Sequence, residues 1–185
     1  MIQLVENIQS WLLNTFQKVD AWFDQDEKLR TYQPQDNGWT INEILEHITL
    51  TNHYLLILIE KGKRKALKKV DEVDLQNVLK DYTFSPKKFE NIGKHRSFVW
   101  VRPEHMEPQG IKALPEVRYI MSAQVQQCVD VLQSLPNGEG LLYKTTMSVD
   151  NLGKLNVYEY IYFLAQHARR HVEQMEKNKR EFLNE

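Results

Sequence analysis

The clearest structural signal in this chain is WTINEILEHITLTNHYLL, residues 39–56. Thr40 and Glu43 have the spacing of a capping box, in which each side chain accepts a hydrogen bond from the backbone N–H of the other residue. We therefore expect a helix that begins after Thr40 and ends near Gly62. The apolar residues in this segment recur every three or four positions, as on the buried face of an amphipathic helix; they include Ile41, Ile44, Leu45, Ile48 and Leu55.

Three other segments have the same apolar period. They are residues 2–29, residues 114–135, and residues 156–182, the last of which opens with a second capping-box spacing. Residues 143–149 have the composition of an extended segment, but no second segment is available to pair with them, so we expect no sheet. Four long helices with links of unequal length predict an all-α, four-helix bundle with a long crossover connection between its second and third helices.

Size and charge narrow the class of protein. A chain of 185 residues is long enough for one hydrophobic core and too short to suggest two, so we expect one domain over residues 1–185. Lys and Arg total 24 against 25 Asp and Glu, a balance that attracts neither nucleic acid nor an anionic membrane. We therefore expect no nucleic acid and no membrane among its partners.

The cysteine content and the apolar stretches bear on localisation. Cys128 is the only cysteine, which excludes a disulfide framework and is typical of a reducing compartment. The first 32 residues lack the basic and apolar regions of a signal peptide. The apolar stretches are also shorter than the roughly 20 residues that span a bilayer. We expect a soluble, cytoplasmic protein in which Cys128 is a small core residue rather than a nucleophile.

The connection over residues 70–114 is irregular and contains several Pro and Gly residues. At most, a short helix is expected within residues 75–82. Long links of this kind are often lids or binding loops. We therefore expect the connection to form one wall of a pocket, with Phe98 and Trp100 as candidate lining residues.

Three histidines form a candidate metal site. His167 and His171 are four residues apart on a predicted helix, so both rings project from one face, one turn apart. His47 lies beside the apolar stripe of another helix and is the candidate third ligand. Three neutral imidazoles would hold a divalent ion and leave at least one coordination position open for water or a substrate atom.

Burial distinguishes this interpretation from its alternatives. His167 follows Phe163 and Leu164 at helical spacing and so continues an inward face. Two buried imidazoles are costly to charge, so the arrangement makes better sense if both are neutral and share a cation. The alternatives are a solvated histidine pair, or histidines that pack in the bundle with no metal at all.

The other three histidines are weaker candidates. His53 follows His47 by six residues, about 240° around the helix, and cannot join the same site. His95 and His105 lie in the irregular connection, where we expect a surface role.

Polar neighbours can orient the ligands but supply no evident catalytic group. Glu43 and Gln174 lie within one helical turn of His47 and His171, and either can orient a ring nitrogen. Trp39 is expected to staple its helix to the core or to floor the pocket. Neither Glu43 nor Glu46 is evidently inside, so the catalytic residues are unknown from the sequence.

Residues 39–56, followed by LGKLNVYEYIYFLAQHARRHVEQ at residues 152–174, resemble the DinB-like, YfiT-type family of metal-binding four-helix bundles. The resemblance covers nearly the whole chain. The family pattern has a tryptophan and a small hydroxyl residue before the second helix, a single histidine on it, and a His-x-x-x-His pair on the fourth. The matching residues here are Trp39, Thr40, His47, His167, Arg170, His171 and Gln174.

The resemblance implies a divalent ion, zinc or nickel, held by His47, His167 and His171, and it implies a homodimer. It also implies an enzyme of thiol S-transferase type, in which the metal activates a low-molecular-weight thiol such as bacillithiol or mycothiol. The partners would then be a small-molecule thiol and an electrophilic substrate. Two other functions stay open: metal-dependent hydrolysis, in which bound water is activated instead, and a non-catalytic metal- or ligand-binding stress-response module.

Overall fold

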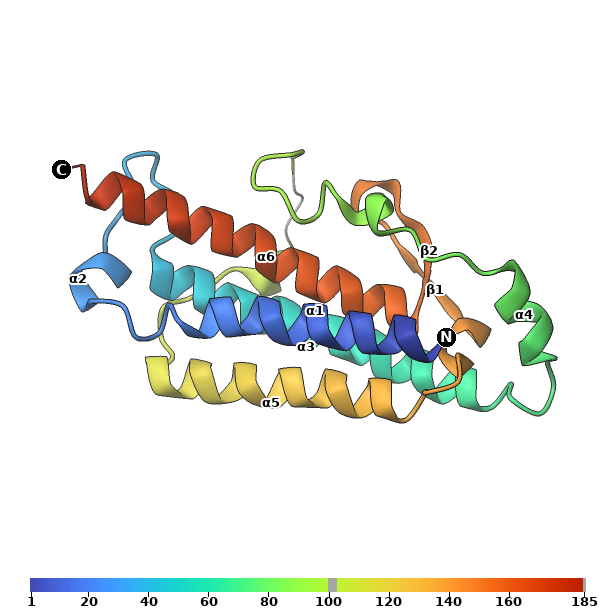
Figure 1. Cartoon of the computed structure of the whole chain (residues 1–185). Helices are drawn as coiled ribbons and strands as arrows, with labels where there is room; N and C mark the ends of the chain where they lie inside the picture. Colours follow the sequence, from blue (N-terminus) through green and yellow to red (C-terminus); the bar gives the residue numbers. More distant parts are fainter. Residues whose placement is uncertain (100–102, 185) are drawn as a thin grey trace.

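Four long helices lie side by side along the molecule (Figure 1). They are α1 (Ile2–Asp20), α3 (Ile41–Leu67), α5 (Leu114–Gln133) and α6 (Val157–Phe182). The computed structural model describes residues 1–99 and 103–184. Helix α6 packs against α1 and α3, and α5 packs against the same two helices from the other side of the molecule. The described chain is mostly helical, which confirms the predicted all-α class.

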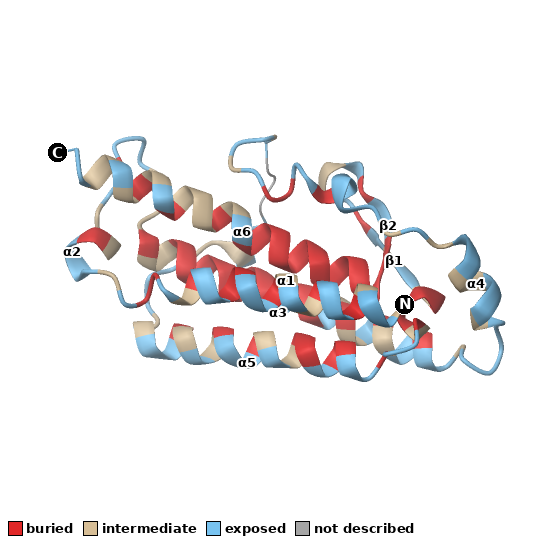
Figure 2. Cartoon of the chain, viewed as in Figure 1, coloured by how far each residue is buried: buried red, intermediate tan, exposed pale blue. Residues whose placement is uncertain are grey.

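The buried residues of the four helices face one another (Figure 2). The apolar period predicted from the sequence coincides with this buried face. On α1, for example, the buried positions are Val5, Ile8, Leu12, Phe16 and Val19, together with Thr15. Burial of apolar area stabilises the fold by roughly 25 cal/mol per Å², so the apolar faces hold the helices that carry the histidines in place.

The first helix is shorter than predicted. We expected it to extend through residue 29, but α1 ends at Asp20 and a separate short helix, α2 (Glu27–Arg30), follows a turn. The Asp26 side chain accepts the backbone N–H of Lys28 at 2.8 Å. Asp26 is thus the N-cap of α2, and an aspartate side chain in this position favours the start of a helix.

Helix α3 is longer than predicted, because Gly62 lies inside it rather than at its end. A Cβ atom at Gly62 would lie 3.1 Å from Val157 Cγ2, at the start of α6. The glycine therefore permits a close approach of the two helices, and this tertiary contact outweighs its low helix propensity of about 1 kcal/mol relative to alanine.

The expectation that no sheet forms was wrong. Strand β1 (Lys144–Met147) pairs antiparallel with β2 (Gly153–Asn156), with Lys144 opposite Asn156 and Met147 opposite Gly153. Positive φ angles at Asp150 and Gly153 turn the chain back between the strands. Strand β2 is only four residues long and runs directly into the cap of α6 at Asn156, so it shows no separate pattern in the sequence.

The long connection contains the predicted short helix, α4 (Leu75–Asp81). Phe89 and Ile92 are fully buried and fasten the connection to the core. Four single turns of 3₁₀ helix complete the described elements, at Pro86–Phe89, Glu104–Met106, Glu139–Leu142 and Val149–Asn151. None of the helices in the described residues has the length and apolar character required to cross a bilayer.

Candidate metal centre

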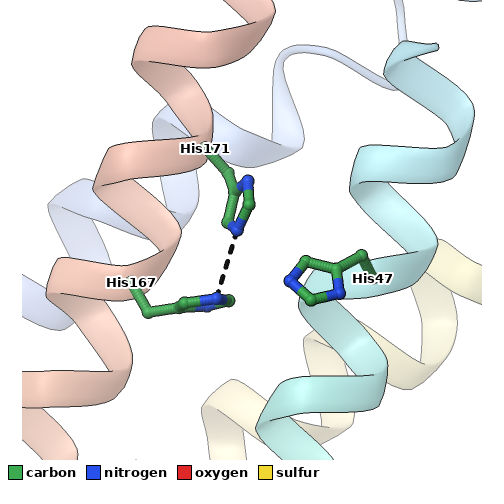
Figure 3. A group of neighbouring side chains, drawn as sticks. All are labelled: His47, His167 and His171. Carbon is green, nitrogen blue, oxygen red and sulfur yellow. Dashed lines mark hydrogen bonds between the residues drawn. The ribbon is translucent and has the colours of Figure 1, made fainter. Parts of the chain in front are cut away.

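Three histidine side chains converge between α3 and α6 (Figure 3). His47 projects from α3, and His167 and His171 project from one face of α6. Each residue is 3 % exposed. One nitrogen from each ring lies within 4.8 Å of the other two. The two helices that the sequence could not place side by side are neighbours, so the three imidazoles can share one ion.

Backbone and amide oxygens orient two of the rings. His47 Nδ1 lies 2.7 Å from the Met106 carbonyl oxygen, and His171 Nδ1 lies 2.9 Å from Gln174 Oε1. An oxygen of either kind can only accept, so each Nδ1 carries the proton and donates it. Each Nε2 is then left with a lone pair. Gln174 thus has the orienting role expected from the sequence, whereas the Met106 carbonyl had not been anticipated.

The separation of the two α6 histidines fits a shared cation. His167 Nε2 and His171 Nε2 are 3.1 Å apart. Two imidazole nitrogens bound at usual distances to a tetrahedral zinc ion would be about 3.3 Å apart. The donor set is nitrogen-only and convergent, which suits zinc, nickel and similar divalent ions alike.

Burial keeps these rings neutral. The pKa of His167 lies well below its usual value because burial disfavours the imidazolium, and nearby His47 and Arg170 act in the same direction. The pKa of His171 is lowered by the same burial and by His167 and His47. Metal ions bind the neutral form of histidine, so no proton must be displaced from either ring at neutral pH.

Trp39 and Thr51 enclose His47. The Trp39 and His47 rings pack with centroids 4.6 Å apart, and Thr51 Oγ1 lies 3.5 Å from His47 Nε2. Trp39 precedes the capping box of α3, in which Thr40 and Glu43 bind each other's backbone N–H. The cap therefore sets both the start of the helix and the tryptophan that packs on its histidine.

A cavity of about 590 Å³ opens onto the three histidines. This volume is in the range of small-molecule sites. Apolar side chains such as Leu55, Met147 and Phe163 line part of it. Cations line another part, namely Arg96, Arg170 and Lys177. The cavity thus offers an apolar surface, positive charge and a potential metal site in one space.

Asp36 supplies the one carboxylate among the residues described as lining this cavity. Its Oδ2 lies 2.6 Å from Lys177 Nζ, and Arg96 pairs with the same oxygen. Lys177 above all, and then Gly38 and Arg96, hold the pKa of Asp36 below its usual range, which makes it a weak base. Glu43 is committed to the helix cap.

Glu46 differs from expectation. It was not evidently inside from the sequence, yet it is 4 % exposed. Its Oε2 accepts the backbone N–H of Gly110 at 2.7 Å. The carboxylate is therefore buried against the connection and is not among the residues that line the cavity.

Of the other three histidines, His53 and His105 lie as predicted from the sequence and His95 does not. His53 and His105 are exposed and do not join the three-histidine cluster. His95 departs from the expected surface role, because it is partly buried and lines the cavity. Burial, assisted by Arg170, lowers the pKa of His95 to about 4.

Cys128 has the core position predicted from the sequence, whereas Phe98 does not line the pocket as predicted. Cys128 is fully buried, and burial raises the pKa of its thiol to about 12, which agrees with a core role. Phe98 is partly buried against the hydrophobic core and is not among the cavity-lining residues. Trp100 lies outside the described residues. The connection does reach the cavity, through His95, Arg96, Pro103 and Met106.

Comparison with known proteins agrees with this geometry. The model of the DinB superfamily matches residues 12–175, which is most of the chain and includes all three histidines. No curated protein and no solved structure gave a match. The family match and the buried histidine cluster point the same way: this chain belongs to the DinB superfamily.

Proposed function

We propose that His47, His167 and His171 bind one divalent metal ion and that the protein is a metal-dependent transferase that acts on a low-molecular-weight thiol. The observation that carries the proposal is the convergence of three buried imidazoles that line an accessible cavity. When bound, a divalent ion would favour the thiolate form of a thiol in the cavity, and the thiolate is the nucleophilic form.

The chain's own residues have three roles in this proposal. The Met106 carbonyl and Gln174 hold His47 and His171 in the tautomer that presents Nε2. Arg170 and Lys177 would attract an anionic group of the thiol or electrophile. The apolar wall would exclude water from the reacting atoms. The thiol sulfur would form a bond to the electrophilic carbon, the leaving group would depart with the bonding electrons, and the thiol proton would pass to solvent.

A non-catalytic role as a metal- or ligand-binding module has one observation in its favour. The carboxylate of Asp36 is held in ion pairs, so the described cavity residues offer no strong general base. This is no obstacle to a thiol, which needs only to lose a weakly held proton, but it weighs against metal-dependent hydrolysis. Retention of a thiol without turnover would select the binding module.

The first test is metal content, measured by mass spectrometry on purified, tag-free protein. Wild type should retain about one zinc or nickel ion per chain, and His171→Ala should lose it. His53→Ala is the matched control, because His53 is an exposed histidine on the same helix as His47. Equal metal content in wild type and His171→Ala would overturn the site.

The second test is thiol conjugation. The metal-loaded protein should accelerate conjugation of a cysteine-containing low-molecular-weight thiol to 1-chloro-2,4-dinitrobenzene, and His171→Ala should not. Hydrolysis of activated esters with no thiol present would instead favour the hydrolase. Absence of turnover across several thiols, with metal bound, would remove the transferase and leave the binding module.

We also propose three further features of the protein, which are independent of these tests. The packing of α1, α3, α5 and α6 supports a four-helix bundle with the residue 70–114 connection as its crossover. Family membership supports a homodimer, which light scattering in solution would test. The single buried cysteine supports a cytoplasmic location.

A further inference from the structure

Two adjacent residues of α3 hold the same short stretch of the crossover connection. His47 Nδ1–H donates to the Met106 carbonyl at 2.7 Å, and the preceding residue, Glu46, accepts the Gly110 N–H at 2.7 Å. The five-residue segment Met106–Gly110 is therefore attached to α3 at both ends. One of these attachments is to a proposed metal ligand.

Glu46 is a charged residue in a buried position, so its role is not that of a solvated surface side chain. A carboxylate that is only 4 % exposed is costly to bury. Its contact with the Gly110 N–H offsets part of that cost, since charge-assisted hydrogen bonds are stronger than neutral ones. An apolar side chain at this helix position would avoid the cost of burial altogether. What the Glu46 carboxylate adds is the hydrogen bond that it accepts from the Gly110 N–H.

Gly110 is adapted to this contact by its backbone rather than by space. Its φ is +66°, in the left-handed region, and a Cβ atom added there would meet nothing within 4 Å. Glycine adopts this conformation without strain, and the conformation allows the chain to turn so that the Gly110 N–H meets Glu46. The turn and the acceptor form one clamp, which we define as Glu46 with Gly110.

We propose that Glu46 is a positioning residue for the metal centre. By holding Gly110, it keeps the Met106 carbonyl against His47 Nδ1 and so keeps the ring oriented with Nε2 directed at His167 and His171. This inference rests on the proposed metal binding and adds to it a residue that touches neither metal nor substrate. Partners that orient a metal-bound histidine typically change metal affinity by 10- to 100-fold.

The clamp also couples metal binding to the connection. If the Met106 carbonyl strengthens metal binding through His47, then bound metal must stabilise the Met106–Gly110 segment to the same extent, because such coupling is reciprocal. The crossover connection would thus be more firmly held in the metal-bound protein than in the metal-free protein.

The test compares Glu46→Met with Glu46→Gln, using zinc affinity from competition with a chromophoric chelator. Glu46→Met removes the acceptor at similar volume and should weaken zinc binding 10- to 100-fold. Glu46→Gln keeps an acceptor oxygen and should recover most of the loss. The cobalt(II) absorption spectrum should change with Met and not with Gln, which a loss of stability alone would not produce.

Glu139→Met is the matched control. Glu139 Oε2 accepts the Asn137 N–H at 2.9 Å in the link after α5, away from the histidines. Its replacement also removes a carboxylate-to-backbone contact, but zinc affinity should be unchanged. Wild-type zinc affinity in folded Glu46→Met would overturn the positioning role and leave the metal site intact. Absence of zinc binding in wild type would instead overturn the proposed function.

A second measurement needs no variant and covers the case in which Glu46→Met does not fold. Hydrogen exchange of the Gly110 amide, followed by NMR on the wild-type protein, should slow when zinc is added. The exchange rate of the Asn137 amide should not change when zinc is added, because this residue is not attached to the Met106–Gly110 segment. Equal exchange of the Gly110 amide with and without zinc would contradict the coupling.

Discussion

Single side chains set the tautomers of the candidate ligands. Gln174 lies on the same helix as His171, one turn further along, and its Oε1 receives the Nδ1 proton. This contact is local in sequence, which is why helical spacing alone suggested it. The equivalent partner of His47 is a backbone carbonyl from a distant segment, and a backbone carbonyl has no signature in the sequence.

Gln174→Leu should weaken zinc binding 10- to 100-fold, because His171 Nδ1 loses its acceptor and the ring loses its fixed tautomer. Gln174→Glu should retain or improve the affinity, since a carboxylate accepts the same proton more strongly. Competition with a chelator on the folded variants measures both. Equal affinities for the Leu variant and wild type would contradict the orienting role.

The metal-free protein should lose stability on acidification. The pKa values of His167 and His171 are lowered by burial from the usual 6.5. Below pH 6.5 the unfolded chain therefore binds more protons than the folded one. The free energy of unfolding should therefore decrease as the pH is lowered below 6.5, by up to about 1.4 kcal/mol per pH unit for each histidine.

Urea denaturation of metal-free protein between pH 7.5 and 5.5 measures this slope. His171→Leu should have a shallower slope than wild type. His95 also has a lowered pKa but is present in both proteins, so the difference isolates His171. Identical slopes would show that His171 does not resist protonation in the folded state.

The elements that carry the ligands are fixed at their starts by side-chain caps. Both α3 and α6 begin with a capping box, formed by Thr40 with Glu43 and by Asn156 with Glu159. These caps define which residue begins each helix, and the rotation of every later side chain follows from that start. His47 is two turns from its cap, so the cap helps to fix the direction in which its ring points.

Thr40→Ala should lower the free energy of unfolding by about 1 kcal/mol, because the Glu43 N–H loses its acceptor. Thr40→Ser keeps a hydroxyl oxygen and should be close to wild type. Thermal or urea denaturation of metal-free protein at neutral pH compares the three. A stability of Thr40→Ala equal to that of wild type would mean that the cap contributes nothing measurable.

The molecule as a whole joins helices from distant parts of the chain at one proposed ion. His47 belongs to α3, and His167 and His171 belong to the last helix. An unfolded chain would not hold these three nitrogens together. A ligand that binds only the folded state raises the free energy of unfolding by mass action.

Zinc at 100 times its dissociation constant should therefore stabilise the wild-type protein by about 2.7 kcal/mol. His53→Ala should respond in the same way, whereas His171→Ala should not respond. Chemical denaturation with and without zinc makes the comparison. The same stabilisation in His171→Ala would place the zinc elsewhere on the molecule.

The sequence determined the features whose causes lie within one or two helical turns. Capping boxes and apolar periods predicted the four long helices, and the spacing of His167 and His171 placed both on one face of α6. These signals are local in the sequence, so they can be recognised without knowledge of the fold. One local signal was missed: the Asp26 side chain that caps the start of α2 lies in the sequence, but the continuing apolar period masked it.

Only the tertiary structure decided which distant segments meet. It paired β1 with β2, extended α3 past Gly62 because α6 passes close by, and brought His47 to the other two histidines. It also placed the Met106 carbonyl on His47 and the Gly110 N–H on buried Glu46. The physical reason is that these contacts depend on the packing of whole helices and on backbone groups that every residue carries, so no residue pattern along the chain distinguishes them in advance.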